Sequence, residues 1–216
     1  MINIRIHMLI LFDCDGTLVD SHQQIITSMQ LAFLDLSLSS PTTAQVADII
    51  GLSLQSAIEL LGCRQTNLIA DIIERYRFHY HRGSSALFSD TRDVIGTLKE
   101  EGHHLGVVTG KSMPGLLSVL EKHHLRDDFL VLRTADCCPS KPHPAMVLES
   151  MDEMGASAAQ TVVIGDATFD MQMAVAAGVR AFGVSTGSHC KQALEEAGAY
   201  RVAPSLDALM ALIERV

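Results

Sequence analysis

Short apolar runs that alternate with helical segments constrain the fold of this chain more than any other feature. Between and after these runs, apolar residues recur at helical spacing over 91–101, 114–123, 142–154, 168–177, 189–197 and 205–215. Continuous apolar strands that alternate with helices are typical of a parallel sheet covered on both faces. The sequence therefore predicts an α/β fold. Its expected strands cover residues 4–12, 105–109, 129–133, 161–164 and 179–184.

Residues 19–83 interrupt this alternation, because we find no strand signal in them. Ser21 is a possible cap of a first amphipathic helix over 25–36. We expect a second helix to begin at Ser40-Pro41, with Pro41 at its first position, and to end at Gly51. A helical module therefore follows the first strand, and Gly83-Ser84-Ser85 is its expected return hinge. Its remaining helices are predicted over 54–61, closed by Gly62, and over 68–80.

Composition narrows the classes of function. The chain of 216 residues has 16 basic and 25 acidic side chains, a net charge of −9, and no run of lysine or arginine, so we expect no nucleic-acid partner. No apolar stretch approaches the roughly 18 residues that span a bilayer, and the run Met8–Phe12 is too short for a signal peptide. Five cysteines without regular spacing, two of them the adjacent Cys137 and Cys138, favour a reducing cytoplasm over a disulfide scaffold or a zinc site.

The first predicted strand ends in Asp13-Cys14-Asp15-Gly16-Thr17-Leu18. In an extended chain, residues i and i+2 point the same way, about 6.5–7 Å apart, so Asp13 and Asp15 face one pocket. Open α/β sheets bind ligands at this carboxyl edge. The pair suggests a metal site, a nucleophile or an acid/base couple. Taken alone, it fits an N-capping pair at a strand–helix turn equally well.

Polar residues also follow the other predicted strands. Thr109 and Gly110 end one strand, and Asp166 follows another, with Asp170 one turn later. Lys141 precedes a proline, which disfavours helical geometry and extends the chain there. Each residue alone could be a helix cap or a surface charge. Together, at one edge of a sheet, they predict a functional site.

This ordered set of residues resembles the haloacid dehalogenase superfamily, and the helical insert resembles the cap of its phosphoglycolate-phosphatase-like branch. The resemblance covers essentially the whole chain. It implies a Rossmann-like sheet as the core, formed by residues 1–18 and 84–216, with a helical cap over 19–83. It also implies a phosphatase that uses Mg²⁺ and acts on a small phosphorylated metabolite through an aspartyl-phosphate.

The roles of the family's residues carry over to matching positions. The resemblance implies that Asp13 is the nucleophile, and that Asp15 is the general acid and then the base for water. It also implies that Thr109 and the Gly110 N–H hold phosphate oxygens. Lys141 would neutralise the charge of the phosphate and of Asp13.

The implied metal is Mg²⁺, bound by Asp13, the Asp15 carbonyl and Asp166. Asp170 would hold these ligands in place. Two like unit charges 4 Å apart repel by about 4 kcal/mol at an effective dielectric near 20. The repulsion between a carboxylate and a phosphate dianion is roughly twice as large. Cations must cancel this repulsion, and Mg²⁺ suits all-oxygen ligands. In the cap, Arg64 is a candidate for binding a second anion of the substrate.

Two other functions stay open at this point. A phosphotransferase similar to β-phosphoglucomutase would use the same residues but pass the phosphoryl group to a sugar hydroxyl, although Gly16-Thr17 looks more like the phosphatase branch. A phospho-receiver module also uses a strand-end Asp with Thr and Lys, but it is about half this length and has no helical insert. The expected partner is a small-molecule phosphate ester, with no membrane and with the chain as a monomer or homodimer.

Overall fold

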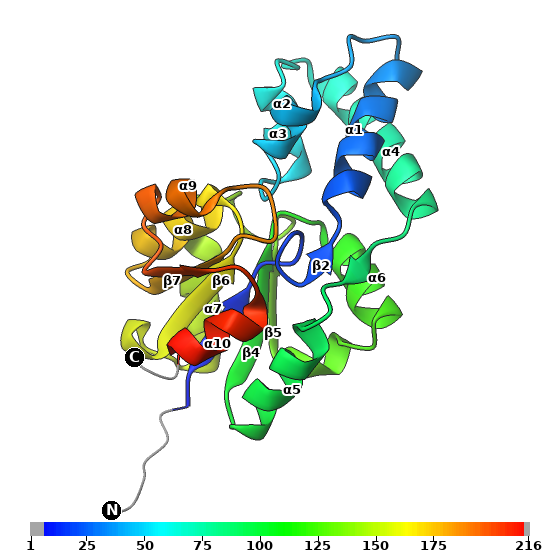
Figure 1. The fold of residues 1–216 in the computed structure, drawn as a ribbon. Helices are drawn as coiled ribbons and strands as arrows, with labels where there is room; N and C mark the ends of the chain where they lie inside the picture. The colour runs from blue at the N-terminus through cyan, green and yellow to red at the C-terminus, as the bar shows by residue number, and fades with distance from the viewer. Residues whose placement is uncertain (1–6, 214–216) are drawn as a thin grey trace, which may run out of the picture.

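A six-stranded parallel sheet forms the centre of the computed structural model, which describes residues 7–213 (Figure 1). The strand order is β5-β4-β1-β6-β7-β8, so the first strand lies in the interior of the sheet. The predicted α/β fold is confirmed, and the parts of the first strand and last helix predicted at 4–6 and 214–215 lie outside the described residues. The strands are β1 (Leu9–Phe12), β4 (His104–Thr109), β5 (Val131–Thr134), β6 (Thr161–Gly165), β7 (Arg180–Val184) and β8 (Arg201–Ala203).

Helices cover both faces of the sheet, which explains why its strands are apolar without alternation. On β1, Ile10 and Phe12 join one apolar cluster, whereas Leu9 and Leu11 join the other. The first cluster is closed by α5 (Thr91–Glu100), α6 (Met113–Lys122) and α10 (Leu206–Ile213). The second is closed by α7 (Ala145–Met154), α8 (Thr168–Ala176) and α9 (Lys191–Glu196). Short 3₁₀ turns cover Arg126–Asp128 and Ala158–Gln160.

The helical insert has an apolar cluster of its own, and Figure 1 shows its helices grouped beyond the sheet. Its members include Ile26, Phe33, Val46, Ile58 and Ile72, all buried. This packing supports the proposed division into a core and a cap, whose boundaries remain a prediction. The helices are α1 (His22–Asp35), α2 (Thr43–Ala47), α3 (Leu54–Leu60) and α4 (Thr66–Arg82).

Two local predictions for the insert are wrong. The second helix begins after Thr42, not at Pro41, because Thr42 and Gln45 form a reciprocal capping box that satisfies two backbone N–H groups. The segment also contains a strand, β2 (Val19–Asp20), which pairs antiparallel with β3 (Ala86–Leu87). This two-stranded ribbon joins the chain entering the helices to the chain leaving them, and it is too short to show alternation in the sequence.

Other element boundaries shift by a few residues. Strand β8 was not predicted, since only three residues form it and the first is a charged arginine. Helix α7 begins at Ala145 rather than at 142, because Pro144 occupies its N-cap position. None of the helices within residues 7–213 has both the length and the apolar character needed to cross a bilayer.

Candidate active site

The predicted functional residues meet at the carboxyl edge of β1, β4 and β6. Asp13 follows β1 directly, and its N–H donates to the Ile164 carbonyl at 2.8 Å, which continues the strand pairing. Asp13 and Asp15 both line one cavity, as the i, i+2 spacing predicts. The turn after them requires glycine: Gly16 has φ +82°, and a Cβ there would lie 2.4 Å from an Asp166 carboxylate oxygen.

Three buried carboxylates form the centre of the site. Asp13, Asp166 and Asp170 each place an oxygen within 4.8 Å of the others. Asp166 is held from two sides, because it accepts from the Thr17 hydroxyl at 2.9 Å and from the Ser188 N–H at 3.0 Å. Within residues 7–213 this is the one group of three or more side chains spaced to hold a metal ion.

Lys141 bridges two of these carboxylates. Its Nζ lies 2.6 Å from Asp13 Oδ1 and 2.5 Å from Asp170 Oδ1, and its side chain is fully buried. Burial opposes the charge of Lys141, but the carboxylates of Asp13 and Asp170 outweigh it and raise the lysine pKa above its usual value. The ammonium is therefore held in place beside the predicted nucleophile, as expected from the sequence.

One ammonium does not balance three carboxylates. Burial is the main cause that raises the pKa of Asp13 to about 7, and the nearby Asp170 and Asp15 add to it, against Lys141. Burial, with the nearby Asp13 and Asp170, also raises the pKa of Asp166. Asp13 Oδ2 is buried and has no hydrogen-bond partner. A cluster of three buried carboxylates with only one ammonium beside it offers oxygen ligands and excess negative charge, which fits a hard divalent cation such as Mg²⁺.

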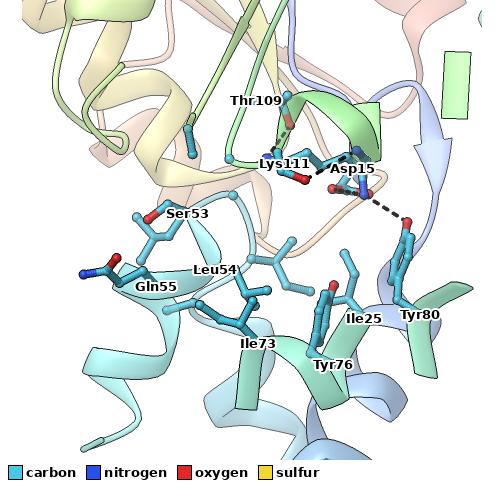
Figure 2. Close-up of a pocket in the computed structure, with 18 of the residues that line it drawn as sticks. Asp15, Ile25, Ser53, Leu54, Gln55, Ile73, Tyr76, Tyr80, Thr109 and Lys111 are labelled. Carbon is cyan, nitrogen blue, oxygen red and sulfur yellow. Dashed lines mark hydrogen bonds and ion pairs between the residues drawn. The ribbon is translucent and has the colours of Figure 1, made fainter. Parts of the chain in front are cut away.

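Asp15 is held apart from this cluster by a different set of contacts (Figure 2). The Lys111 Nζ lies 2.9 Å from Asp15 Oδ2, and the Ser21 hydroxyl donates to Oδ1 at 2.5 Å. Lys111 also donates to the Tyr80 hydroxyl at 2.9 Å, so it links Asp15 to helix α4. Burial opposes the Lys111 charge, but Asp15 and Tyr80 raise its pKa well above the usual value. Ser21, predicted as a cap, makes no side-chain cap bond because its hydroxyl binds Asp15.

The remaining predicted residues divide into two groups. Thr109 and Gly110 line the same cavity as Asp13, and Gly110 packs so closely on the insert that a Cβ would lie 2.2 Å from the Leu52 carbonyl oxygen. Arg64 is exposed and lies elsewhere, in a neighbouring hollow lined also by Lys141. The structure thus does not bring Arg64 into the cavity that contains Asp13.

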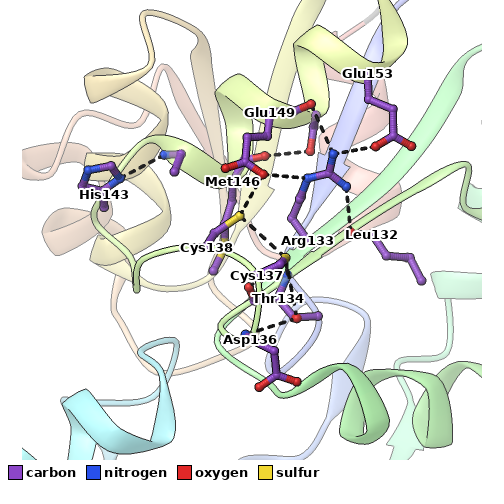
Figure 3. Close-up of polar contacts among 12 residues, drawn as sticks. Leu132, Arg133, Thr134, Asp136, Cys137, Cys138, His143, Met146, Glu149 and Glu153 are labelled. Atoms are coloured by element: carbon purple, nitrogen blue, oxygen red, sulfur yellow. Dashed lines mark hydrogen bonds and ion pairs between the residues drawn. The ribbon is translucent and has the colours of Figure 1, made fainter.

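A polar network anchors the segment that leads to Lys141 (Figure 3). Arg133 on β5 pairs with Glu149 at 3.4 Å and with Glu153 at 2.5 Å on α7. Cys138 donates to Glu149 at 3.4 Å and lies 3.7 Å, sulfur to sulfur, from Cys137. Burial raises the pKa of Cys138 to about 12. Cys138 is thus a buried, protonated thiol whose contact with Glu149 helps fix the loop.

Comparison with known proteins agrees with this geometry. A family profile described as haloacid dehalogenase-like hydrolase matches residues 10–184, a range that contains Asp13, Thr109, Lys141 and Asp166. The chain belongs to the haloacid dehalogenase-like hydrolase family. A Dickeya dadantii protein named "Probable phosphatase IndB" is 32% identical over 197 residues, covering 88% of this chain and 86% of that protein.

Two further relatives extend the likeness. A phosphoglycolate phosphatase of Aliivibrio fischeri is 31% identical over 191 residues, covering 83% of this chain and 84% of the relative. The crystal structure of a haloacid dehalogenase-like hydrolase from Bacteroides fragilis superposes with a TM-score of 0.87 at 27% identity, covering 94% of this chain and 99% of that chain. The fold, including the helical insert, is therefore shared with a hydrolase of this family.

Sequence reasoning missed several residues of the site. Gly187 packs so tightly that a Cβ would lie 1.8 Å from Asp166 Oδ2, and its neighbour Ser188 binds the same carboxylate. The available signal was their position in the loop after β7, at the same sheet edge as the other site residues. Lys111 directly follows Gly110, so the sequence places a cation near the predicted phosphate site but does not indicate its pairing with Asp15. Its contact with Tyr80 depends on the placement of α4, which no local pattern indicates.

Proposed function

We propose that this phosphatase hydrolyses the phosphate ester of a small metabolite, with Asp13 as nucleophile and Mg²⁺ as cofactor. One observation carries the proposal. Asp13 Oδ1 is bound by Lys141 at 2.6 Å, whereas Oδ2 is buried at the cavity edge without a partner. A carboxylate oriented through one oxygen and unpaired at the other is suited to attack an electrophile.

The residues of this chain divide the reaction between them. Asp13 attacks phosphorus and forms an aspartyl-phosphate, while Asp15 donates a proton to the departing alkoxide. Asp15 then takes a proton from the water that attacks the aspartyl-phosphate, which releases inorganic phosphate and regenerates Asp13. Lys111 and Ser21 orient Asp15 through the two contacts on its carboxylate. Thr109 and the Gly110 N–H would hold the phosphate oxygens.

Charge neutralisation is the main electrostatic task. Carboxylate and phosphate dianion repel by about 8 kcal/mol at 4 Å and an effective dielectric near 20. Mg²⁺, bound by Asp13, the Asp15 carbonyl and Asp166 with Asp170 beside them, would supply the positive charge that lets the two anions meet. Lys141 supplies one further positive charge through its contact with Asp13.

The test is turnover of an aryl phosphate by the wild type and by Asp13→Asn, with MgCl₂ and with EDTA. We expect the substitution and the chelator each to abolish phosphate release. Asp152→Asn on the exposed side of α7 is the matched control and retains activity. Full activity of Asp13→Asn would show that another group is the nucleophile.

Phosphotransfer to a sugar uses the same residues, so the acceptor distinguishes the two reactions. Release of inorganic phosphate without any sugar acceptor supports hydrolysis, whereas formation of a sugar phosphate without release of inorganic phosphate supports the mutase alternative. Membership of a hydrolase family disfavours the phospho-receiver alternative. A cytoplasmic location and a monomeric or homodimeric state remain predictions.

A further inference from the structure

The cavity above Asp13 has two walls of opposite character (Figure 2). The wall formed by the sheet edge carries the polar residues Asp13, Asp15, Thr109 and Lys111. The facing wall comes from the insert and is mainly apolar, although Ser53, Gln55, Arg77 and His81 also line it. Its apolar members are Ile25, Met29, Ile50, Leu54, Ile73 and Tyr76.

Helical spacing explains how α4 presents its part of this wall. Ile73, Tyr76 and Tyr80 stand at positions i, i+3 and i+7, which share one face of a helix. Tyr76 and Tyr80 stack, with ring centres 5.7 Å apart and an interplanar angle of 24°. Only the Tyr80 hydroxyl is tied to the polar wall, through Lys111. The rest of this face is available to contact a substrate.

Few positive charges are available for a second anion. Among the described residues that line the cavity, those able to carry positive charge are Lys111, Arg77 and His81. Lys111 is already paired with Asp15, and Arg77 and His81 are exposed. An ion pair with an exposed side chain such as Arg77 or His81 is worth little, and a carboxylate placed against the apolar side chains would lose water without gaining a partner there, which is costly.

The size of the cavity also favours a substrate larger than a short phosphorylated acid. Its volume is about 600 Å³, within the range of about 300–1,000 Å³ typical of sites for ligands of many heavy atoms. A phosphate on a two-carbon acid would fill only a small part of this space. It would leave the apolar wall exposed to water rather than to substrate.

We infer that the alcohol portion of the substrate carries an apolar, ring-sized body that packs on Ile25, Ile73 and Tyr76 while the phosphate reaches Asp13. This inference rests on the proposed phosphatase function and specifies its substrate class. It distinguishes the chain from an enzyme whose substrate is a short phosphorylated acid. Apolar contact far from phosphorus contributes binding that can also favour the transition state.

The test compares kcat/KM of the wild type, with MgCl₂, for ethyl phosphate, phenylethyl phosphate and phosphoglycolate. The two primary alcohols have similar leaving groups, so their ratio reports the pocket rather than the chemistry. We expect phenylethyl phosphate to exceed both other esters by at least about tenfold. A ratio near one, or a preference for phosphoglycolate, would overturn the inference while leaving the phosphatase function intact. No hydrolysis of any ester would instead contradict the proposed function.

Variants then locate the preference. Ile73→Ala should lower the phenylethyl-to-ethyl ratio by about threefold or more, since it removes apolar contact from the wall. Leu34→Ala, at a position 57% exposed on the insert and outside the cavity, is the matched control and leaves the ratio unchanged. Circular dichroism checks folding, and Leu54→Ala replaces Ile73→Ala if the latter is unfolded. An unchanged ratio in a folded cavity variant would contradict the placement of the apolar body.

Discussion

Replacing Asp13 by asparagine should stabilise the protein in the absence of metal, although it removes the proposed nucleophile. The reason is the excess negative charge of the carboxylate cluster. Burial and neighbouring carboxylates raise the Asp13 pKa from 3.8 to about 7 in the folded state. Folding therefore favours the protonated form of Asp13. The contribution of this protonation to the free energy of unfolding is fully present below about pH 4 and is lost as the pH rises through about 7.

The magnitude follows from this shift. Relative to a fully protonated side chain, the raised pKa of Asp13 destabilises the folded state by about 2 kcal/mol near pH 5 and by about 4 kcal/mol near pH 8, because one pKa unit corresponds to about 1.4 kcal/mol. An asparagine at position 13 does not ionise, so it adds no such pH dependence to the stability. Its side-chain oxygen can still accept a hydrogen bond from Lys141. The stability difference between variant and wild type should thus grow by about 2 kcal/mol over this range, or about 4–8 °C in Tm.

Thermal unfolding of both proteins in EDTA, near pH 5 and near pH 8, measures this difference, with Asp152→Asn as the control. Excess MgCl₂ should reduce it near pH 8, because a bound cation stabilises the ionised wild-type site. A difference that stays constant with pH, or falls as the pH rises, would refute the electrostatic reasoning.

Three further results are expected. Gly187→Ala should displace Asp166, because the new Cβ would lie 1.8 Å from its Oδ2. We therefore expect Mg²⁺ affinity, measured by calorimetric titration, to fall about 10- to 100-fold. Gly96→Ala, with open space around the glycine, is the control and should leave Mg²⁺ affinity unchanged. Lys111→Met should lower kcat for ethyl phosphate by about 100-fold. It should affect kcat for an aryl phosphate much less, because an aryl leaving group needs little protonation. Equal losses for the two substrates would argue against a role of Lys111 in orienting Asp15. Iodoacetamide at neutral pH should leave Cys138 unmodified in peptide mass spectra, since its pKa is raised to about 12; rapid labelling would contradict its buried, protonated state.

Much of the fold and of the polar cluster could be predicted because the signals are local. An apolar strand that ends in a carboxylate shows in the sequence, and parallel topology brings all such ends to one edge. Asp13, Asp166 and Lys141 therefore meet as expected, although residues 13 and 141 are 128 positions apart. Which oxygen of Asp13 stays unpaired does not follow from the strand topology.

The remaining features depend on placement in three dimensions. The contact of Tyr80 with Lys111 requires a particular position of α4 over the sheet, and sequence spacing within either segment carries no information about it. The sequence shows that Arg64 is a cation of the insert, but the short helix α3 and the turn after it leave it exposed outside the cavity. Propensity alone predicts a helix start at Pro41, whereas the capping box at Thr42 provides two hydrogen bonds.

The central claim is that the unpaired oxygen of Asp13 attacks phosphorus. Acid quench of the enzyme during turnover, followed by borohydride reduction and peptide mass spectrometry, tests it most directly, since reduction converts an acyl-phosphate into an alcohol. The account predicts homoserine at position 13, in samples with MgCl₂ and not in samples with EDTA. Reduction at another residue, or an unmodified Asp13 in an enzyme that is turning over substrate, would contradict it.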